Sequence, residues 1–261
     1  MKTNYHTHTT RCMHAVGSDE EYVLIAIKGG FQILGFSDHT PWKYRTSYVA
    51  DMRMLPEELP EYIESLQYLR EKYRDQIDIK IGLECEYFPE YIPWLKEQIK
   101  KYQLNYILFG NHHFHTDEKF PYFGHHTNNR DMLDLYEESA IEGMESGLYN
   151  CLAHPDLFMR SYPKFDHHCA TISRHICRTA ARLNIPLEYN IGYVAYNEEH
   201  GLNTYPCPNF WHIAANEGCT AIIGMDAHNN NDLEVPIYYE RALQELKELK
   251  IKTTDTLKMM Y

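Results

Sequence analysis

The sequence has no apolar run that approaches the roughly 20 residues needed to span a bilayer. Its first six residues lack the apolar stretch of a secretory signal. The seven cysteines are odd in number and form no C-x-x-C pair, which argues against a disulfide framework. These absences argue against a membrane partner and favour a cytoplasmic protein whose thiols are reduced.

Positive charge is also scarce. Lys and Arg number 25 against 37 Asp and Glu, which gives a formal net charge of −12, and the basic residues form no stripe. A nucleic-acid partner is therefore not expected, because such binding depends largely on neutralising phosphates. A small anionic substrate is compatible with this balance, since bound metal ions can reverse the local field.

Low-complexity linkers and internal repeats are absent too, so residues 1–261 are expected to form a single domain. Hydrophobic residues make up 44% of the chain, which is enough for a substantial core. Seven segments have strand-like patterns, and helical patterns lie between them. The strand candidates are residues 2–6, 32–37, 78–84, 105–110, 149–153, 185–190 and 220–225.

This alternation of strands and helices predicts an α/β fold with a parallel sheet and right-handed crossovers. Seven units indicate a distorted seven-stranded (β/α) TIM-like barrel, and an open doubly wound sheet is the alternative architecture. Barrel enzymes place their chemistry at the carboxyl ends of the strands. Side chains of metal-ligand type at those ends are therefore the candidates for a functional site.

Histidine and acidic side chains do occur at these strand ends. His6 and His8 follow the first strand candidate two residues apart, so both rings point to one face. Asp226 and His228 repeat this spacing after the last candidate, and closure of a barrel would bring the two pairs together. Two imidazoles on one face can hold a divalent ion, although a polar core also explains an isolated H-x-H pattern.

Further candidates end the middle strands. Asp38 and His39 precede a Thr-Pro turn, and one or both could be ligands. Alternatively, Asp38 caps the next turn and His39 is solvated. Glu84 ends the third candidate and has two oxygens that can bridge two ions, while Glu86 has the same strand parity and competes for this role. His154 ends the fifth candidate, where a buried His bonded to backbone is the alternative.

These ligands are too many for one ion. A catalytic zinc takes about three protein ligands, so two ions need about six and three need about nine with sharing. Mixed nitrogen and oxygen donors suit Zn, Mn or Fe, and the usual work of such centres is hydrolysis. The nine candidates are His6, His8, His14, His39, Glu84, His113, His154, Asp226 and His228.

The order of these motifs resembles that of the polymerase and histidinol phosphatase (PHP) superfamily. The resemblance runs from residue 6 to residue 228, and the segments His-Thr-His-Thr, Cys-Met-His-Ala and Ser-Asp-His-Thr are similar to its histidinol-phosphate phosphatase branch. The motifs that carry it are His6-Thr7-His8 with His14, Asp38-His39, Gly82-Leu83-Glu84, Gly110-Asn111-His112-His113-Phe114, His154-Pro155-Asp156 and Asp226-Ala227-His228.

The resemblance implies a distorted barrel with three divalent metal ions at the strand ends. One ion would take His6, His8, Glu84 and Asp226. A second would share Glu84 and take His113 and His154, and the third would take His14, His39 and His228. In the family motif the ligand histidine directly precedes a phenylalanine, and this register selects His113 over His112. Asp38 precedes a ligand, so it would either support that ligand or act as a proton donor.

By the same resemblance, the reaction is hydrolysis of L-histidinol phosphate to L-histidinol and phosphate in histidine biosynthesis. Arg160 is the expected catalytic phosphate clamp, since it lies six residues beyond His154, and Arg45 is the second candidate. A surface salt bridge is the alternative for either arginine. Glu188 and Asn190 end the sixth strand candidate and could meet the amine or the imidazole of the substrate, although Glu188 could equally be a buried structural carboxylate.

Three other functions compete with this one. A PHP nuclease, or a phosphoesterase for another small ester, would share the metal site, but the net charge argues against nucleic acid. A non-catalytic regulatory metal-binding domain would have substituted ligands, whereas all nine positions are kept. An amidohydrolase-like barrel also opens with H-x-H, but it commonly uses a lysine bridge, and no lysine lies at a suitable strand end.

Overall fold

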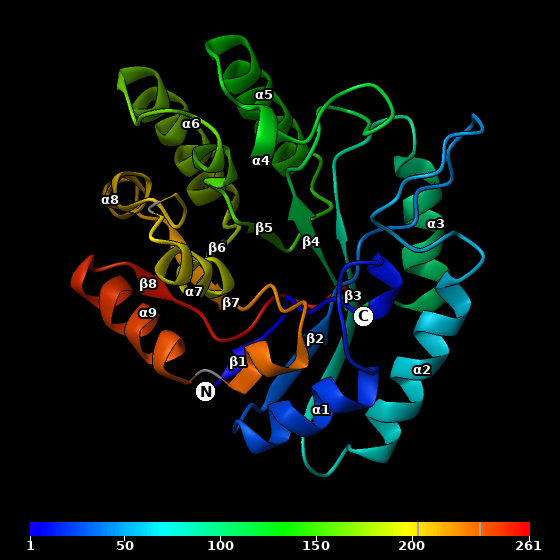
Figure 1. Cartoon of the computed structure of the whole chain (residues 1–261). Helices are drawn as coiled ribbons and strands as arrows, with labels where there is room; N and C mark the ends of the chain where they lie inside the picture. Colours follow the sequence, from blue (N-terminus) through cyan, green and yellow to red (C-terminus); the bar gives the residue numbers. More distant parts are fainter. Residues whose placement is uncertain (203, 235) are drawn as a thin grey trace.

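The computed structural model describes residues 1–202, 204–234 and 236–261. Within these residues, eight parallel strands form one sheet whose spatial order follows the chain (Figure 1). The strands are β1 (Thr3–Asn4), β2 (Ile33–Phe36), β3 (Asp78–Cys85), β4 (Tyr106–Gly110), β5 (Cys151–Ala153), β6 (Leu187–Asn190), β7 (Thr220–Gly224) and β8 (Lys252–Thr253). The parallel α/β sheet is confirmed, whereas the expected number of strands was one too low.

The additional strand is β8. It consists of two exposed residues with no apolar run, so its composition does not distinguish it from a loop. It pairs with the amino-terminal end of β7, where Thr220 lies opposite Lys252.

The sheet curls until its first and seventh strands meet beyond their carboxyl ends. There the His8 N–H donates to the Ala227 carbonyl at 2.9 Å, and the Ala227 N–H donates to the His6 carbonyl at 3.1 Å. At the opposite end of the strands, the Thr3 hydroxyl donates to the Asp255 carbonyl at 2.8 Å, just after β8. This closure supports the barrel-like architecture over an open sheet, and it joins the two ends of the chain that carry ligand candidates.

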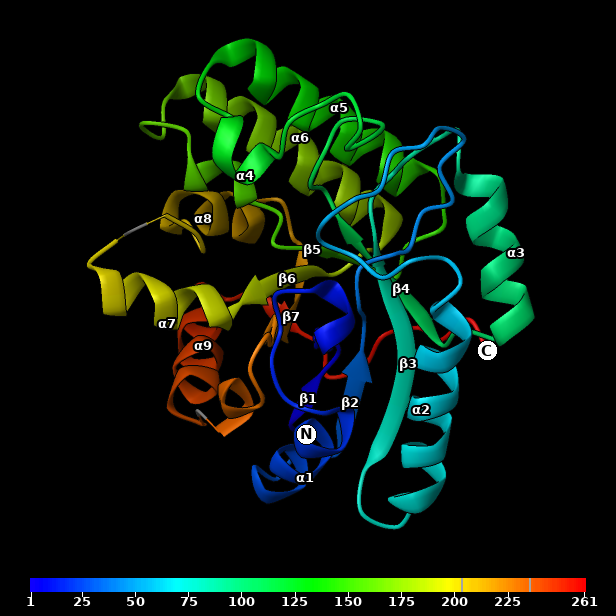
Figure 2. The ribbon, with the colours of Figure 1, turned by 45° about the vertical axis from the view of Figure 1, so that its right-hand side comes forward.

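Helices cover the outer face of the curled sheet (Figures 1 and 2). Their apolar stripes face the strands; in α6, for example, Ile172, Ile176 and Ala180 are fully buried. A capping box between Ser18 and Glu21 begins α1. No helix in the described ranges is long and apolar enough to cross a membrane.

The helices and the shorter 3-10 segments supply the connections between strands. They are α1 (Asp19–Lys28), α2 (Leu59–Lys72), α3 (Ile92–Tyr102), α4 (Phe123–His126), α5 (Arg130–Glu145), α6 (His167–Leu183), α7 (Ile191–His200), α8 (Pro208–Asn216) and α9 (Pro236–Glu248), with η1 (Thr10–Cys12), η2 (Leu157–Arg160) and η3 (Asn230–Glu234).

Tyr106 of β4 fills the interior of the curled sheet. Its fully buried hydroxyl reaches across to the carbonyl oxygens of Tyr5, at 2.6 Å, and Phe36, at 3.0 Å. Gly82 makes room for this ring, since a Cβ there would lie 2.7 Å from Tyr106 Cζ. The barrel interior is therefore solid, and the functional side chains lie above it at the carboxyl ends of the strands.

Candidate metal centre

The residues that follow β1 and β7 meet as one group. His6 Nε2 and His8 Nε2 are 3.1 Å apart, and Asp226 Oδ1 lies 3.3 Å from each of them. Asp226 has a φ of 48°, a left-handed conformation that turns its carboxylate back toward the strand ends. The pairing of the first and last motifs that the sequence predicts is therefore present in the structure.

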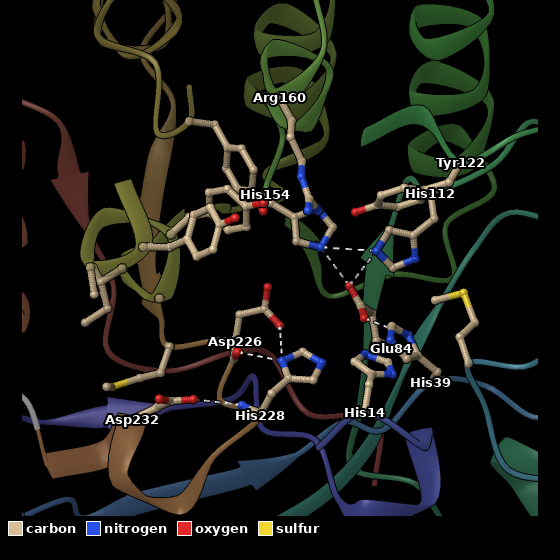
Figure 3. A pocket seen from close by; sticks show the side chains of 18 of the residues that line it. His14, His39, Glu84, His112, Tyr122, His154, Arg160, Asp226, His228 and Asp232 are labelled. Atoms are coloured by element: carbon tan, nitrogen blue, oxygen red, sulfur yellow. Dashed lines mark hydrogen bonds and ion pairs between the residues drawn. The ribbon is translucent and has the colours of Figure 1, made fainter. Parts of the chain in front are cut away.

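Glu84, at the end of β3, lies at the centre of the candidate ligands (Figure 3). Its Oε1 is 2.8 Å from His154 Nε2 and 3.5 Å from His6 Nε2. Its Oε2 is 3.1 Å from His39 Nδ1 and 3.5 Å from His8 Nε2. Because the two oxygens face different histidines, Glu84 has the arrangement of a bridging carboxylate.

A third group of imidazoles lies beside His8. The His8 and His228 rings stack with centroids 4.1 Å apart, and His14 stacks on His228 at 4.6 Å. His14 Nδ1 is 2.7 Å from the Cys12 carbonyl, and His228 Nδ1 is 2.9 Å from the Asp226 carbonyl, so Nδ1 is the donor in both rings. Each Nε2 therefore presents a lone pair, as in metal-binding histidines.

His112, rather than His113, enters this cluster. His112 Nε2 lies 3.3 Å from both His154 Nε2 and Glu84 Oε1. The His113 ring borders the same cavity; its Nδ1 donates to the Phe120 carbonyl at 2.9 Å, and its Nε2 has no hydrogen-bond partner among the described residues. These distances favour His112 at the position that the family register assigned to His113.

The electrostatics of the cluster are those of a cation site. Burial alone would raise the pKa of Glu84, yet His112 and His6 hold that pKa well below its usual value. Burial lowers the pKa of His39 to about 4 and that of His228 to about 3, and His8 contributes to both shifts. Although burial opposes it, the neighbouring carboxylates raise the pKa of His8 to about 9 and that of His112 to about 10. The carboxylates thus favour positive charge at this place, which a bound cation would also supply.

One buried nitrogen tests whether metal ions fit these residues. His228 Nε2 has no hydrogen-bond partner in the described part of the chain. An unpaired buried polar atom is costly, and a bound cation would satisfy it. Several histidine and carboxylate groups also converge with ligand atoms within 4.8 Å of one another, among them His6, His8 and Asp226. This donor set fits divalent ions such as Zn, Mn or Fe.

Glu188 and Asn190 of β6 lie behind the ligands and not in the cavity. Glu188 Oε1 is 2.7 Å from His6 Nδ1, and its Oε2 accepts from the His154 N–H at 3.1 Å. Asn190 donates to Asp226 Oδ2 at 3.0 Å, and its own oxygen caps α7. Both side chains are almost fully buried, and their hydrogen bonds to ligand candidates are typical of groups that orient metal-binding side chains.

Asp38 also lies behind the ligands. It accepts from the Thr9 hydroxyl and, at 2.8 Å, from the His39 N–H, and its Oδ1 is 3.6 Å from His8 Nδ1. Burial opposes ionisation, but His8 lowers the pKa of Asp38 below its usual value. The carboxylate is ionised and fully buried, so its position fits support of His8 better than protonation of a leaving group.

A cavity of about 820 Å³ opens above the ligands. Arg160, from η2, reaches into it from the side opposite Asp226 (Figure 3). Its guanidinium lies 5.2 Å from the Tyr193 ring centroid and 5.9 Å from that of Tyr122. Arg45, the second expected phosphate contact, is instead a surface residue, 72% exposed and paired with Glu90 at 2.9 Å.

The chain is similar to phosphatases of known name. It is 29% identical over 259 residues to the probable histidinol-phosphatase of Deinococcus radiodurans, covering 95% of this chain and 94% of that one. A 96-residue segment is 32% identical to the histidinol-phosphatase of Bacillus subtilis, covering 34% and 35% of the two chains.

Among solved structures, a neighbour is the histidinol phosphate phosphatase of Lactococcus lactis, which was crystallised with zinc, L-histidinol and phosphate. The TM-score is 0.74 at 19% identity, with 100% of this chain and 99% of that one covered, so the two share a fold. The PHP domain family matches residues 4–192, most of the chain. The chain therefore belongs to the PHP domain family.

Proposed function

We propose that this protein is a cytoplasmic histidinol-phosphatase, which hydrolyses L-histidinol phosphate to L-histidinol and phosphate in histidine biosynthesis. The observation that carries the proposal is the cluster around Glu84, a set of metal-ligand side chains at the floor of a cavity that one arginine enters. Full-length similarity to the Deinococcus radiodurans protein supports the substrate. The Lactococcus lactis neighbour shares the fold and holds both products of this reaction.

Three divalent ions, Zn, Mn or Fe, fit the donor set. The first would be held by His6, His8, Glu84 and Asp226. The second would be held by Glu84, His112 and His154, and the third by His14, His39 and His228. Relative to the set expected from sequence, His112 takes the place of His113. Bound ions of this kind polarise phosphoryl oxygens and lower the pKa of water, which is the chemistry that phosphate-ester hydrolysis needs.

Arg160 is the residue that binds the phosphoryl group in this proposal. It is half-buried, and the faces of Tyr122 and Tyr193 hold its guanidinium at the cavity. The planar fork of guanidinium donors suits phosphate oxygens. Its hydrogen bonds become stronger as negative charge develops on the phosphoryl group. Arg45, on the surface, has no part in it.

The alcohol of the substrate would occupy the aromatic side of the cavity. Tyr193 and Tyr205 stack there with centroids 4.0 Å apart, and Asp51 and Glu199 also border the space. Aromatic faces suit an imidazole, and the carboxylates suit an ammonium group. This combination favours a cationic phosphate ester over other small esters.

The test is phosphate release by the protein after metal removal with a chelator and reloading with Mn or Zn. We expect far faster release from L-histidinol phosphate than from generic phosphomonoesters, with no hydrolysis of single-stranded nucleic acid. Metal analysis is expected to find more than one ion per chain. Equal rates on all substrates would overturn the assigned substrate, and a single tightly bound ion would overturn the multinuclear centre.

A further inference from the structure

Arg53 is a charged side chain in the core of the protein, in the connection between β2 and α2. Its side chain is only 2% exposed. Burial of a guanidinium is costly unless ion pairs and hydrogen bonds compensate it. Nη1 donates to Glu86 Oε2 at 3.0 Å, and Nη2 donates to Glu86 Oε1 at 3.0 Å, which makes a bidentate pair. Arg53 also donates to the Thr40 carbonyl and to Asp117, each at 2.9 Å.

The carboxylate of Glu86 is fixed on all sides. Its Oε2 also accepts from Trp42 Nε1 at 2.8 Å, and its Oε1 is 3.0 Å from His112 Nδ1. Because a carboxylate only accepts, His112 Nδ1 must be the donor. The Nε2 atom of this ring then faces Glu84 and the proposed metal centre, where it belongs to the second ion's ligand set.

The ion pairs of Arg53 and Glu86 also connect His112 to two loops, the one after β2 and the one after β4. Asp117 lies in the connection after β4, and it accepts from the Tyr44 hydroxyl at 2.6 Å as well as from Arg53. Asp51 and Met52, which directly precede Arg53, line the cavity. The position of the cavity wall and the orientation of His112 are therefore set by one ion-pair network.

We propose that Arg53 and Glu86 form a positioning pair for the metal centre, which fixes the tautomer and direction of His112 and so sets the affinity for the ion that His112, His154 and Glu84 hold. This inference rests on the metal centre under the proposed function. Groups that orient a metal-binding histidine typically change metal affinity about 10- to 100-fold when they are removed.

The direct test compares Glu86→Gln with Glu84→Gln by metal analysis after dialysis against graded chelator concentrations. Glu86→Gln keeps the size of the side chain but places amide hydrogens against Arg53 or His112. We expect it to weaken one ion about 10- to 100-fold and to leave the others in place. Glu84→Gln, at the bridging position, should weaken two ions. The positioning role would be overturned if neither variant weakened the binding of any ion. It would also be overturned if both variants lost all of their ions.

The arginine is tested by Arg53→Met and Arg53→Lys, with Arg45→Met as the control from the same connection. We expect the affinity for one ion to fall in the order wild type, Arg53→Lys, Arg53→Met, while the surface control is unchanged. Thermal unfolding in excess chelator measures the stability of the metal-free protein separately. If Arg53→Met does not fold, the proposal is tested by the affinities for this ion in Arg53→Lys and Glu86→Gln, which should both be lower than the wild-type affinity.

A purely structural role predicts a different result, because all ions would then weaken in proportion to the lost stability. That outcome, or wild-type metal affinity in folded Arg53 and Glu86 variants, overturns the proposal. None of these measurements uses L-histidinol phosphate. A wild-type protein that binds its ions but does not hydrolyse that ester would therefore overturn the proposed substrate and leave this inference intact.

Discussion

Glu188 holds His6 in one orientation, with its Oε1 2.7 Å from His6 Nδ1. The other carboxylate oxygen accepts from the His154 backbone, so one buried side chain fixes two strand ends. Gly224 of β7 leaves the space for it, since a Cβ at this position would overlap Glu188 Oε1. Nδ1 of His6 is thereby the donor to Glu188, and Nε2 is left to face Asp226 and Glu84 at the proposed metal centre.

Glu188→Gln is expected to lower metal affinity and kcat/KM about 10- to 100-fold, because an amide no longer enforces this tautomer. Metal titration and phosphate release measure the two quantities. Glu217→Gln is the control, since the ion pairs of Glu217 within the described ranges are with surface arginines on α6. Wild-type metal affinity in Glu188→Gln would show that the carboxylate is a structural group alone.

Gly110 should be required for the metal centre for a steric reason. A Cβ at Gly110 would lie 2.6 Å from both Glu84 Oε1 and His112 Cε1, so Gly110→Ala must displace ligands. Gly82→Ala is the matched control, because its Cβ would meet Tyr106 of the barrel interior instead. Both variants are expected to lose about 1–3 kcal/mol of unfolding free energy. Only Gly110→Ala should also lose bound ions; equal metal content in the two would contradict this account.

The sequence predicted the ligand types because strand ends are recognisable from short apolar runs. Period-two spacing paired His6 with His8, and closure of the sheet brought them to Asp226, as expected. The choice between His112 and His113 rested on a family register, because β4 ends at Gly110. A turn follows, in which the His112 N–H donates to the Gly110 carbonyl at 2.9 Å, and it has no strand periodicity from which the ring directions could be predicted. β8 was missed because two exposed residues carry no pattern.

The supporting residues were harder to predict than the ligands. Glu188 was recognised as a strand-end residue, but whether it faces a substrate or a ligand depends on the twist of β6. Arg53 lies in an irregular connection with no periodicity, and its burial depends on Glu86 and Asp117, 33 and 64 residues away in sequence. Such long-range pairing leaves no local signal.

Metal analysis of His112→Ala and His113→Ala tests the revised ligand. His112→Ala is expected to lose one ion, because its Nε2 lies 3.3 Å from both His154 and Glu84. His113→Ala should keep all ions, since among the described residues no hydrogen bond or ion pair joins its ring to Glu84 or His154, and any effect should fall on substrate binding at the cavity wall. The reverse pattern would restore the family register.

Arg160 should contribute to catalysis through the phosphoryl group. Arg160→Met is expected to lower kcat/KM about 100- to 1,000-fold, as for the loss of one donor that stabilises developing charge. Arg160→Lys should recover only part of this, because an ammonium group lacks the planar fork. Metal content should be unchanged in both variants, which separates this role from those of the ligands. Unchanged kinetics in Arg160→Met would make the arginine a part of the cavity wall only.

Asp166, which does not line the cavity, should stabilise the fold in a pH-dependent manner. Its carboxylate accepts from the Cys169 N–H at 3.0 Å and caps α6, and this hydrogen bond lowers the pKa of Asp166 below its usual value. The ionised form is thus favoured in the folded state. Its contribution is fully present above the ordinary Asp pKa and is lost as the pH falls through the lowered value.

Asp166→Ala is therefore expected to cost about 1 kcal/mol of unfolding free energy at neutral pH, and less in acid. Asp166→Asn is the matched control, because an amide oxygen can also cap the helix but does not titrate. Urea unfolding of the metal-free protein from pH 6 downward measures these differences. The gap between wild type and Asp166→Ala should narrow with acidification, whereas the gap between Asp166→Asn and Asp166→Ala should stay constant. A gap that widens in acid would contradict the ionised cap.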